Sequence, residues 1–336
     1  MKKRLTWILC VCLLVLLTAC GGKTEQAGTE QKGTKENAAV EKEAFSQDLL
    51  TQTGTYLYET VTNPTFGSVG GEWTVLGLAR SGMEIPEEYF ETYFENLSAY
   101  TAQHSGVLHE RKYTEYSRVI LAVTAIDRDP ADVGGFDMLA PLADFEQTVF
   151  QGINGAIFAL LAADSGNYEL PENTVGTTQA TRELYVDHIV NAQTVEGGWS
   201  LGGGEAEIDL TAMALQALAK YQDRKDVKEA IEKGLALLSD KQNEKGGYGE
   251  GATAGSESVS QVLVALSELG ISYEDSRFVK KGNTLVDALM EFRLEDGSFS
   301  HLYGAESNLL ATEQAFYALV SVERMTEGES SLYRIK

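Results

Sequence analysis

Gln193-Thr-Val-Glu-Gly197-Gly-Trp199 is the stretch from which the fold of this chain is best predicted. Two later segments match it: Gln242-Asn-Glu-Lys-Gly246-Gly-Tyr248 and Arg293-Leu-Glu-Asp-Gly297-Ser-Phe299. Each begins with Gln or Arg, continues with three residues and a glycine, and ends, one residue later, with an aromatic side chain. The three glycines are 49 and then 51 positions apart. Self-similarity at a fixed spacing indicates a repeat architecture.

The sequence around each segment has helical periodicity. Apolar residues recur at intervals of three and four before each segment, over about 181–193, 226–242 and 277–292. After each segment and a short loop comes a second helical stretch, which ends in Ala-Leu at 217–218, 265–266 and 318–319. The repeating unit is therefore a helix, a tight loop and a second helix, in roughly fifty residues.

Weaker copies of this unit precede the three clear ones. Gly70-Gly-Glu-Trp73, Tyr113-Thr-Glu-Tyr116 and Gln151-Gly-Ile-Asn154 each open an apolar helical stretch. Together the copies give six helix pairs between residues 45 and 325. The sequence thus predicts an all-α fold, an α6/α6 toroid (a double-walled helical barrel), with an open solenoid as the structural alternative.

We assign the motif residues to stability rather than to ligand contact. The glycines allow a positive φ just past a helix end, the rings fill the gap between hairpins, and the glutamines can satisfy open backbone groups. The residues in these roles are Gln193, Gly197, Trp199, Gln242, Gly246, Tyr248, Gly297 and Phe299.

The motif at this spacing resembles the prenyltransferase and squalene oxidase repeat of terpenoid cyclases and protein prenyltransferase β-subunits. It is also similar to the α/α toroid of the cobalamin carriers intrinsic factor and transcobalamin. The clear copies cover about 181–325. The resemblance implies functional groups near the N-terminal ends of the inner helices, facing a central cavity. It is specific for the fold and much less so for the function.

The sequence lacks the residues that carry the known chemistries of these families. The Asp-x-Asp-Asp acid motif of squalene-type cyclases is absent, and its nearest match, Asp127-Arg-Asp129-Pro130, is predicted to be a turn. Prenyltransferases bind zinc through Asp, Cys and His, but the region around Glu257 has no Cys, so we expect no metal and no cofactor. Thioester toroids need a Cys, which the predicted domain lacks.

What remains is a ring of polar and aromatic residues near the predicted starts of the inner helices. These candidates for a ligand-binding cavity mouth are Glu72, Trp73, Tyr113, Glu115, Tyr116, Arg118, Asn154, Asp209, Glu257, Gln261, Glu313 and Gln314. Helix caps or a solvated rim are the alternative, because carboxylates favour helix N-termini.

Two groups of residues also allow an enzymatic interpretation. The first is His104, His109, Tyr113, Glu115, Tyr116 and Arg118. It has the residue types that polysaccharide lyases use around a uronate, but the spacing is not diagnostic, and a helix start with surface side chains is favoured. Asp209, Glu257 and Glu313 could supply a glycosidase pair, although the sequence does not give their separation.

The first twenty residues predict a lipid anchor. Lys2, Lys3 and Arg4 precede an apolar run over 5–17, and Leu17-Thr-Ala-Cys20 resembles a bacterial lipobox. We expect a signal peptide over 1–19, a lipid on Cys20, and a flexible polar tether over 20–44 that holds the domain at the extracytoplasmic face of the membrane. An ordinary signal peptide or a transmembrane anchor is the alternative.

Net charge and cysteine content limit the classes of partner and the covalent links that the domain can have. The formal net charge is −23, and removal of Lys2, Lys3 and Arg4 with the signal peptide makes it −26, so nucleic acid is excluded as a partner. The three cysteines lie at 10, 12 and 20, so no disulfide is expected in the domain.

The sequence therefore favours a monomeric, non-catalytic protein that binds a small or hydrophobic ligand, with a short C-terminal tail over 326–336. The cobalamin carriers make a corrinoid one candidate ligand, but those proteins use a second β domain that this sequence does not show. The other functional classes are an enzyme, either a terpene cyclase-like isomerase or a carbohydrate lyase or hydrolase, and a protein-interaction scaffold.

Overall fold

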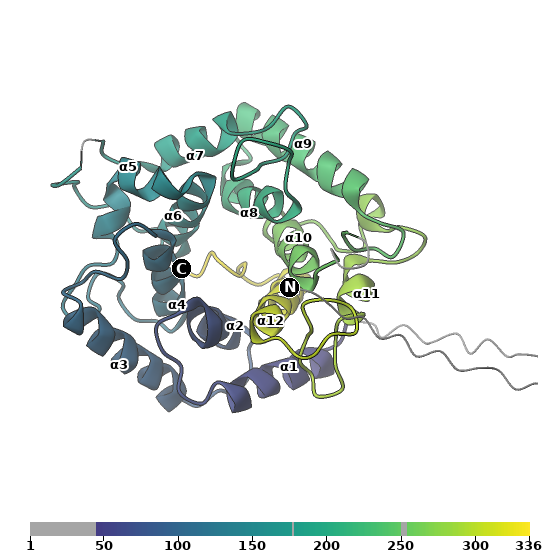
Figure 1. Ribbon diagram of the computed structural model, residues 1–336, viewed down its shortest axis with the longest axis horizontal. Helices are drawn as coiled ribbons and strands as arrows, with labels where there is room; N and C mark the ends of the chain where they lie inside the picture. Colours follow the sequence, from purple (N-terminus) through teal and green to yellow (C-terminus); the bar gives the residue numbers. More distant parts are fainter. Residues whose placement is uncertain (1–44, 177, 250–253) are drawn as a thin grey trace, which may run out of the picture. The chain divides into compact units, whose positions relative to one another are not determined.

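The computed structural model describes residues 45–176, 178–249 and 254–336 (Figure 1). The predicted signal peptide over 1–19, the lipid site Cys20 and the tether over 20–44 lie outside these residues. The described residues all belong to one compact unit.

The described residues are helical, and the prediction of an all-α fold is confirmed. They contain α1 (Gln47–Thr60), α2 (Trp73–Arg80), α3 (Glu87–Gln103), α4 (Thr114–Ala125), α5 (Phe145–Thr148), α6 (Ile153–Ser165), α7 (Arg182–Asn191), α8 (Ile208–Leu218), α9 (Lys225–Lys241), α10 (Ser256–Glu268), α11 (Leu285–Met290) and α12 (Leu309–Thr326). β-Structure within these ranges is limited to isolated bridges. None of these helices combines the length and apolar character that crossing a bilayer requires.

The even-numbered helices pack against one another in sequence. The pairs α2–α4, α4–α6, α6–α8, α8–α10 and α10–α12 are in contact, and α12 also contacts α2 (Figure 1). Around them lie α1, α3, α7, α9 and α11 (Figure 1). The inner helices are therefore covered on their outer side, and in α10 all but two residues are buried, as expected for a helix enclosed by others.

The glutamines of the repeat motif join neighbouring hairpins. Gln193 Nε2 donates to Gly197 O and to Ala230 O, which belongs to α9 of the next hairpin. Gln242 Nε2 donates in the same way to Gly246 O and Phe278 O. One side chain thus satisfies a carbonyl in its own loop and another in the following repeat, which fixes how the two units pack.

The third copy of the motif contacts the first helix of the domain. Arg293 donates a hydrogen bond to the Gln52 side chain in α1. Gly297 has a φ of +88°, and a Cβ atom there would lie 3.1 Å from Gln52 O. The last clear repeat therefore packs on α1, near one end of the domain, much as the earlier copies pack on their successors.

The helix predicted over 277–292 is shorter than expected. A single 3-10 turn, Ser276–Phe278, precedes α11, which begins only at Leu285. Lys281 and Gly282 between them have φ values of +52° and +81°. Lys280 and Asn283 exchange backbone hydrogen bonds across this turn. A left-handed turn cannot continue an α-helix, so the helix begins later than the apolar periodicity of the sequence predicts.

Residues 329–336, called the C-terminal strap below, pack across the inner helices. Leu332 and Tyr333 are buried, and Arg80 of α2 donates to the carbonyls of Ser330 and Ser331. Figure 1 shows the end of the chain running across the middle of the helical ring. The residues that the sequence set apart as a tail therefore contribute to the core.

Candidate functional site

A cavity of about 180 Å³ lies among the inner helices. Its lining comes from the strap and from α2, α4, α6, α8, α10 and α12: Trp73, Thr114, Arg118, Asn154, Phe158, Met213, Gln261, Gln314, Tyr317 and Tyr333. Trp73 and Thr114 are the first residues of their helices, and Asn154 is the second of its helix. The cavity therefore reaches the N-terminal ends of the inner helices, where the sequence predicted it.

Aromatic rings form much of the wall. The ring of Trp73 lies 6.0 Å from that of Phe158 and 5.5 Å from that of Tyr317, centre to centre. Both spacings are typical of packed aromatic pairs, and the rings are tilted rather than parallel. Together with Met213 they form the apolar part of a lining whose other side chains are mainly polar.

Amides from three helices form a hydrogen-bonded chain along another part of the wall. Gln216 of α8 donates to Gln261 Oε1 at 3.0 Å. Gln261 Nε2 donates to Gln314 Oε1 at 2.9 Å and to Tyr317 Oη at 2.6 Å. These contacts fix the orientation of both cavity amides, because each has a partner that determines which end is the donor.

Asn154 differs from the other polar side chains of the cavity. Its Oδ1 atom is buried and accepts no hydrogen bond from the described residues. A buried acceptor without a partner is unfavourable by about 1–3 kcal/mol. Asn154 also lines the cavity, so it is the polar residue of the lining that carries an unsatisfied acceptor among the described residues.

Arg118 is held by two carboxylates. Its Nε atom lies 3.3 Å from Glu72 Oε2, and its Nη2 atom contacts Glu115. Glu72 is fully buried and also accepts from Tyr93 Oη and Gly67 N. Burial raises the pKa of Glu72 to about 7, although Arg118 opposes the rise. Near neutral pH the compensation of the Arg118 charge therefore depends on the protonation of Glu72.

Glu313 is a second buried carboxyl. Its Oε1 atom accepts from Gly70 N at 2.8 Å and from the Thr74 hydroxyl. Its Oε2 atom is buried and has no hydrogen-bond partner among the described residues. Burial raises its pKa to about 7. It is not among the residues that line the cavity, although its helical neighbour Gln314 is.

Two further acidic candidates lie near one another. Glu257 is paired with His301, whose Nδ1 atom is 2.8 Å from the carboxylate, a partner that the sequence did not reveal. Burial raises the pKa of Asp209, and the nearby Glu257 carboxylate raises it as well. Asp209 Oδ1 has no hydrogen-bond partner in the described part of the chain. Neither carboxyl lines the cavity.

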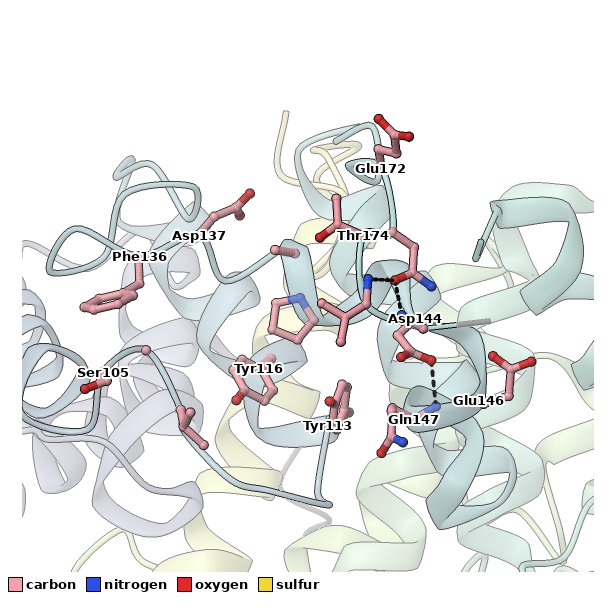
Figure 2. A pocket seen from close by; sticks show the side chains of 17 residues that line it. Ser105, Tyr113, Tyr116, Phe136, Asp137, Asp144, Glu146, Gln147, Glu172 and Thr174 are labelled. Atoms are coloured by element: carbon pink, nitrogen blue, oxygen red, sulfur yellow. Dashed lines mark hydrogen bonds between the residues drawn. The ribbon is translucent and has the colours of Figure 1, made fainter. Parts of the chain in front are cut away.

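A larger groove of about 740 Å³ lies elsewhere on the same unit (Figure 2). Tyr113 and Tyr116 lie in its middle, with Phe136 on one side and Asp144 on the other (Figure 2). Two of its polar side chains make hydrogen bonds within the protein: Asp144 Oδ1 accepts from Gln147 N, and Asn173 Oδ1 accepts from Gly176 N.

The residues predicted for the cavity mouth therefore divide into three groups. Lining the central cavity are Trp73, Arg118, Asn154, Gln261 and Gln314. Tyr113 and Tyr116 line the outer groove. Lining neither are Glu72, Glu115, Asp209, Glu257 and Glu313.

Five residues of the cavity lining were not among the candidates from the sequence: Phe158, Met213, Tyr317, Tyr333 and Thr114. The first three lie one or two helical turns beyond the helix starts, so a search further along the inner faces could have found them. Tyr333 follows the repeats and had no signal. No group of three or more His, Cys, Asp or Glu residues in the described ranges is placed to bind a metal.

Comparison with known proteins shows the fold. No model of a protein family and no curated protein matches the sequence. Among solved structures, a type II terpene cyclase, an MstE variant from Scytonema in complex with geranylgeranyl dihydroxybenzoate, matches with a TM-score of 0.58 at 13% identity, over 83% of this chain and 99% of that chain. A polysaccharide lyase matches with a TM-score of 0.50 at 13% identity, over 84% and 97%. The chain thus resembles the helical folds of terpene cyclases and polysaccharide lyases.

Proposed function

We propose that this domain is an α6/α6 toroid of six helical hairpins whose central cavity binds a small neutral ligand with an aromatic or apolar body and one hydrogen-bond donor. The observation that carries the proposal is the buried, unpartnered Oδ1 of Asn154 in a cavity walled by Trp73, Phe158 and Tyr317. Aromatic side chains that lie beside converging polar groups are typical of ligand sites.

The volume limits the ligand. A cavity of about 150 Å³ holds one benzene molecule, and drug-sized ligands occupy about 300–1,000 Å³. At about 180 Å³, this cavity suits one ring with a small substituent. A corrinoid or a polyprenyl chain is much larger, so neither is part of the proposal.

The charges favour a neutral ligand. Arg118 is the basic residue of the cavity lining, and Glu72 and Glu115 contact its guanidinium group. The remaining polar lining is made of amides and hydroxyls. A fully charged ligand would lose its hydration without an unpaired counter-charge to replace it.

We also propose that the protein is a lipoprotein, held at the extracytoplasmic face of a bacterial membrane through Cys20. The lipobox-like Leu17-Thr-Ala-Cys20 and the acidic, cysteine-free sequence that follows support this assignment. Tethering would keep the cavity close to molecules that reach the cell surface.

An enzyme of the terpene cyclase class is the second candidate function. Glu313 supports it, because burial raises its pKa to about 7 and a carboxyl that holds its proton near neutral pH can act as a general acid. Its position outside the cavity lining argues for binding instead, since a general acid must reach the reacting atom.

Calorimetric titration with phenol and toluene tests the binding proposal. The two ligands have nearly the same shape, but only phenol can donate to Asn154. We expect phenol to bind more tightly, and we expect Asn154→Ala to weaken phenol about threefold to tenfold while toluene changes little. Asn191→Ala, on the exposed end of α7, is the matched control. Equal binding of phenol to the wild type and Asn154→Ala would refute the role of Asn154.

A further inference from the structure

Tyr333 lies at the opposite end of the cavity from the helix starts. The strap to which it belongs contacts the C-terminal ends of the inner helices: Arg80 is the last residue of α2, Ser165 of α6 and Glu268 of α10. The cavity therefore extends from the N-terminal ends of these helices down to the Tyr333 ring.

The strap is fixed on each side of Tyr333. Before it, Arg80 Nη2 donates to Ser331 O at 2.7 Å, and Arg324 Nε donates to Ser330 O at 2.7 Å. After it, Ile335 N donates to Ser165 O at 2.9 Å. These contacts span the ring from α2 and α12 to α6, so the segment is held at both ends.

Glu268 fixes Tyr333 itself. Its Oε1 atom accepts from Tyr333 N at 3.2 Å, and its backbone carbonyl accepts from Arg334 Nη2 at 3.0 Å. Leu332 and Tyr333 are 0% and 2% exposed. Of these two buried side chains, only Tyr333 lines the cavity. The phenol ring is therefore a rigid floor rather than a surface side chain that can swing away.

We infer that Tyr333 sets the largest ligand that the central cavity accepts, because its ring closes the deep end of a cavity that would otherwise continue toward the strap. This inference rests on the proposed function of the cavity. It assigns a specificity-determining role to a segment outside the repeats. The ligand class is a single aromatic ring with a hydrogen-bond donor, and the excluded class is the same ring extended by a second one.

The test is a size series on the full chain. Phenol and para-phenylphenol are titrated against the wild type, Tyr333→Ala, Tyr333→Phe and Leu332→Ala, and a melting curve verifies that each variant is folded. Tyr333→Phe keeps the ring, and Leu332→Ala removes a buried strap side chain that does not line the cavity. Tyr333→Val replaces Tyr333→Ala if the latter does not fold.

We expect the wild type and both controls to prefer phenol, and Tyr333→Ala to bind para-phenylphenol at least about tenfold more tightly than the wild type does. An unchanged ratio of the two affinities in Tyr333→Ala would overturn the inference while leaving the binding proposal intact. If the wild type binds neither probe, the binding proposal fails. A gain of para-phenylphenol binding by Tyr333→Ala would then still support the floor, and its absence would overturn it.

Discussion

Arg118 Nε lies 3.3 Å from Glu72 Oε2, so the basic group of the cavity wall is paired with a carboxyl that is itself fully buried. Burial raises the pKa of Glu72 to about 7 in spite of this pairing. The pair links the stability of the domain and the charge of the cavity to pH, and each link can be measured.

The stability provided by Glu72 should fall as pH rises. Its pKa is higher in the folded protein, about 7, than the ordinary value of 4.5, so the folded state binds the proton more tightly between these values. Relative to Glu72→Gln, the wild type should lose roughly 3 kcal/mol of unfolding free energy from pH 4 to pH 8. Urea unfolding at several pH values measures this, with exposed Glu95→Gln on α3 as control. Parallel curves for the wild type and Glu72→Gln would contradict it.

The affinity of the cavity for an anion should respond to the same proton. When Glu72 is protonated below about pH 7, the Arg118 charge is less compensated and can attract a carboxylate. Benzoate should therefore bind severalfold more tightly at pH 6 than at pH 8, whereas toluene should not change. Calorimetry on Glu72→Gln, which carries no titrating group there, should show benzoate binding without this pH dependence.

The repeat glycines should differ from other left-handed glycines. Gly246 has a φ of +87°, and a Cβ there would lie 2.4 Å from Thr284 O. Gly282 has a similar φ of +81°, but a Cβ there would meet nothing within 4 Å. Gly246→Ala should destabilise the protein by about 1–3 kcal/mol more than Gly282→Ala, because only the first adds a backbone clash to the unfavourable φ. Urea midpoints compare the two, and equal losses would show that the close approach is unimportant.

The lipid anchor is tested in cells. Cys20→Ser should lose incorporation of a fatty-acid analogue, and the protein should be released from the membrane fraction, because the thiol that carries the lipid is gone. Cys12→Ser, within the segment to be removed, is the matched control. Continued labelling of Cys20→Ser would refute the assignment.

The hairpins and their junctions were predictable because each is encoded locally. A glycine past a helix end, an aromatic ring two residues later and a glutamine four residues earlier all lie in one stretch of sequence, and in two copies the glutamine makes equivalent bonds. Asn154, Gln261 and Gln314 could be placed near the cavity because helical periodicity fixes which face of a helix is turned inward.

The positions of the other site residues depend on how separate helices pack against one another. The sequence predicted both Glu313 and Asn154 at the cavity mouth, but the Glu313 side chain bonds instead to Gly70 and Thr74. Tyr113 and Tyr116, at the start of α4, line the outer groove, whereas Thr114 and Arg118 beside them line the cavity. Tyr333 belongs to no repeat, and only the three-dimensional path of the strap brings it to the cavity.

Native mass spectrometry of the protein extracted from its host shows whether the cavity holds a ligand. The wild type is compared with Met213→Trp, which fills the cavity with a larger ring, once a melting curve has shown that the variant is folded. We expect the wild type to retain one small aromatic or apolar molecule that is missing from Met213→Trp. A folded wild type that carries no added mass, or a molecule retained equally by both proteins, would contradict a ligand site at the centre of the helices.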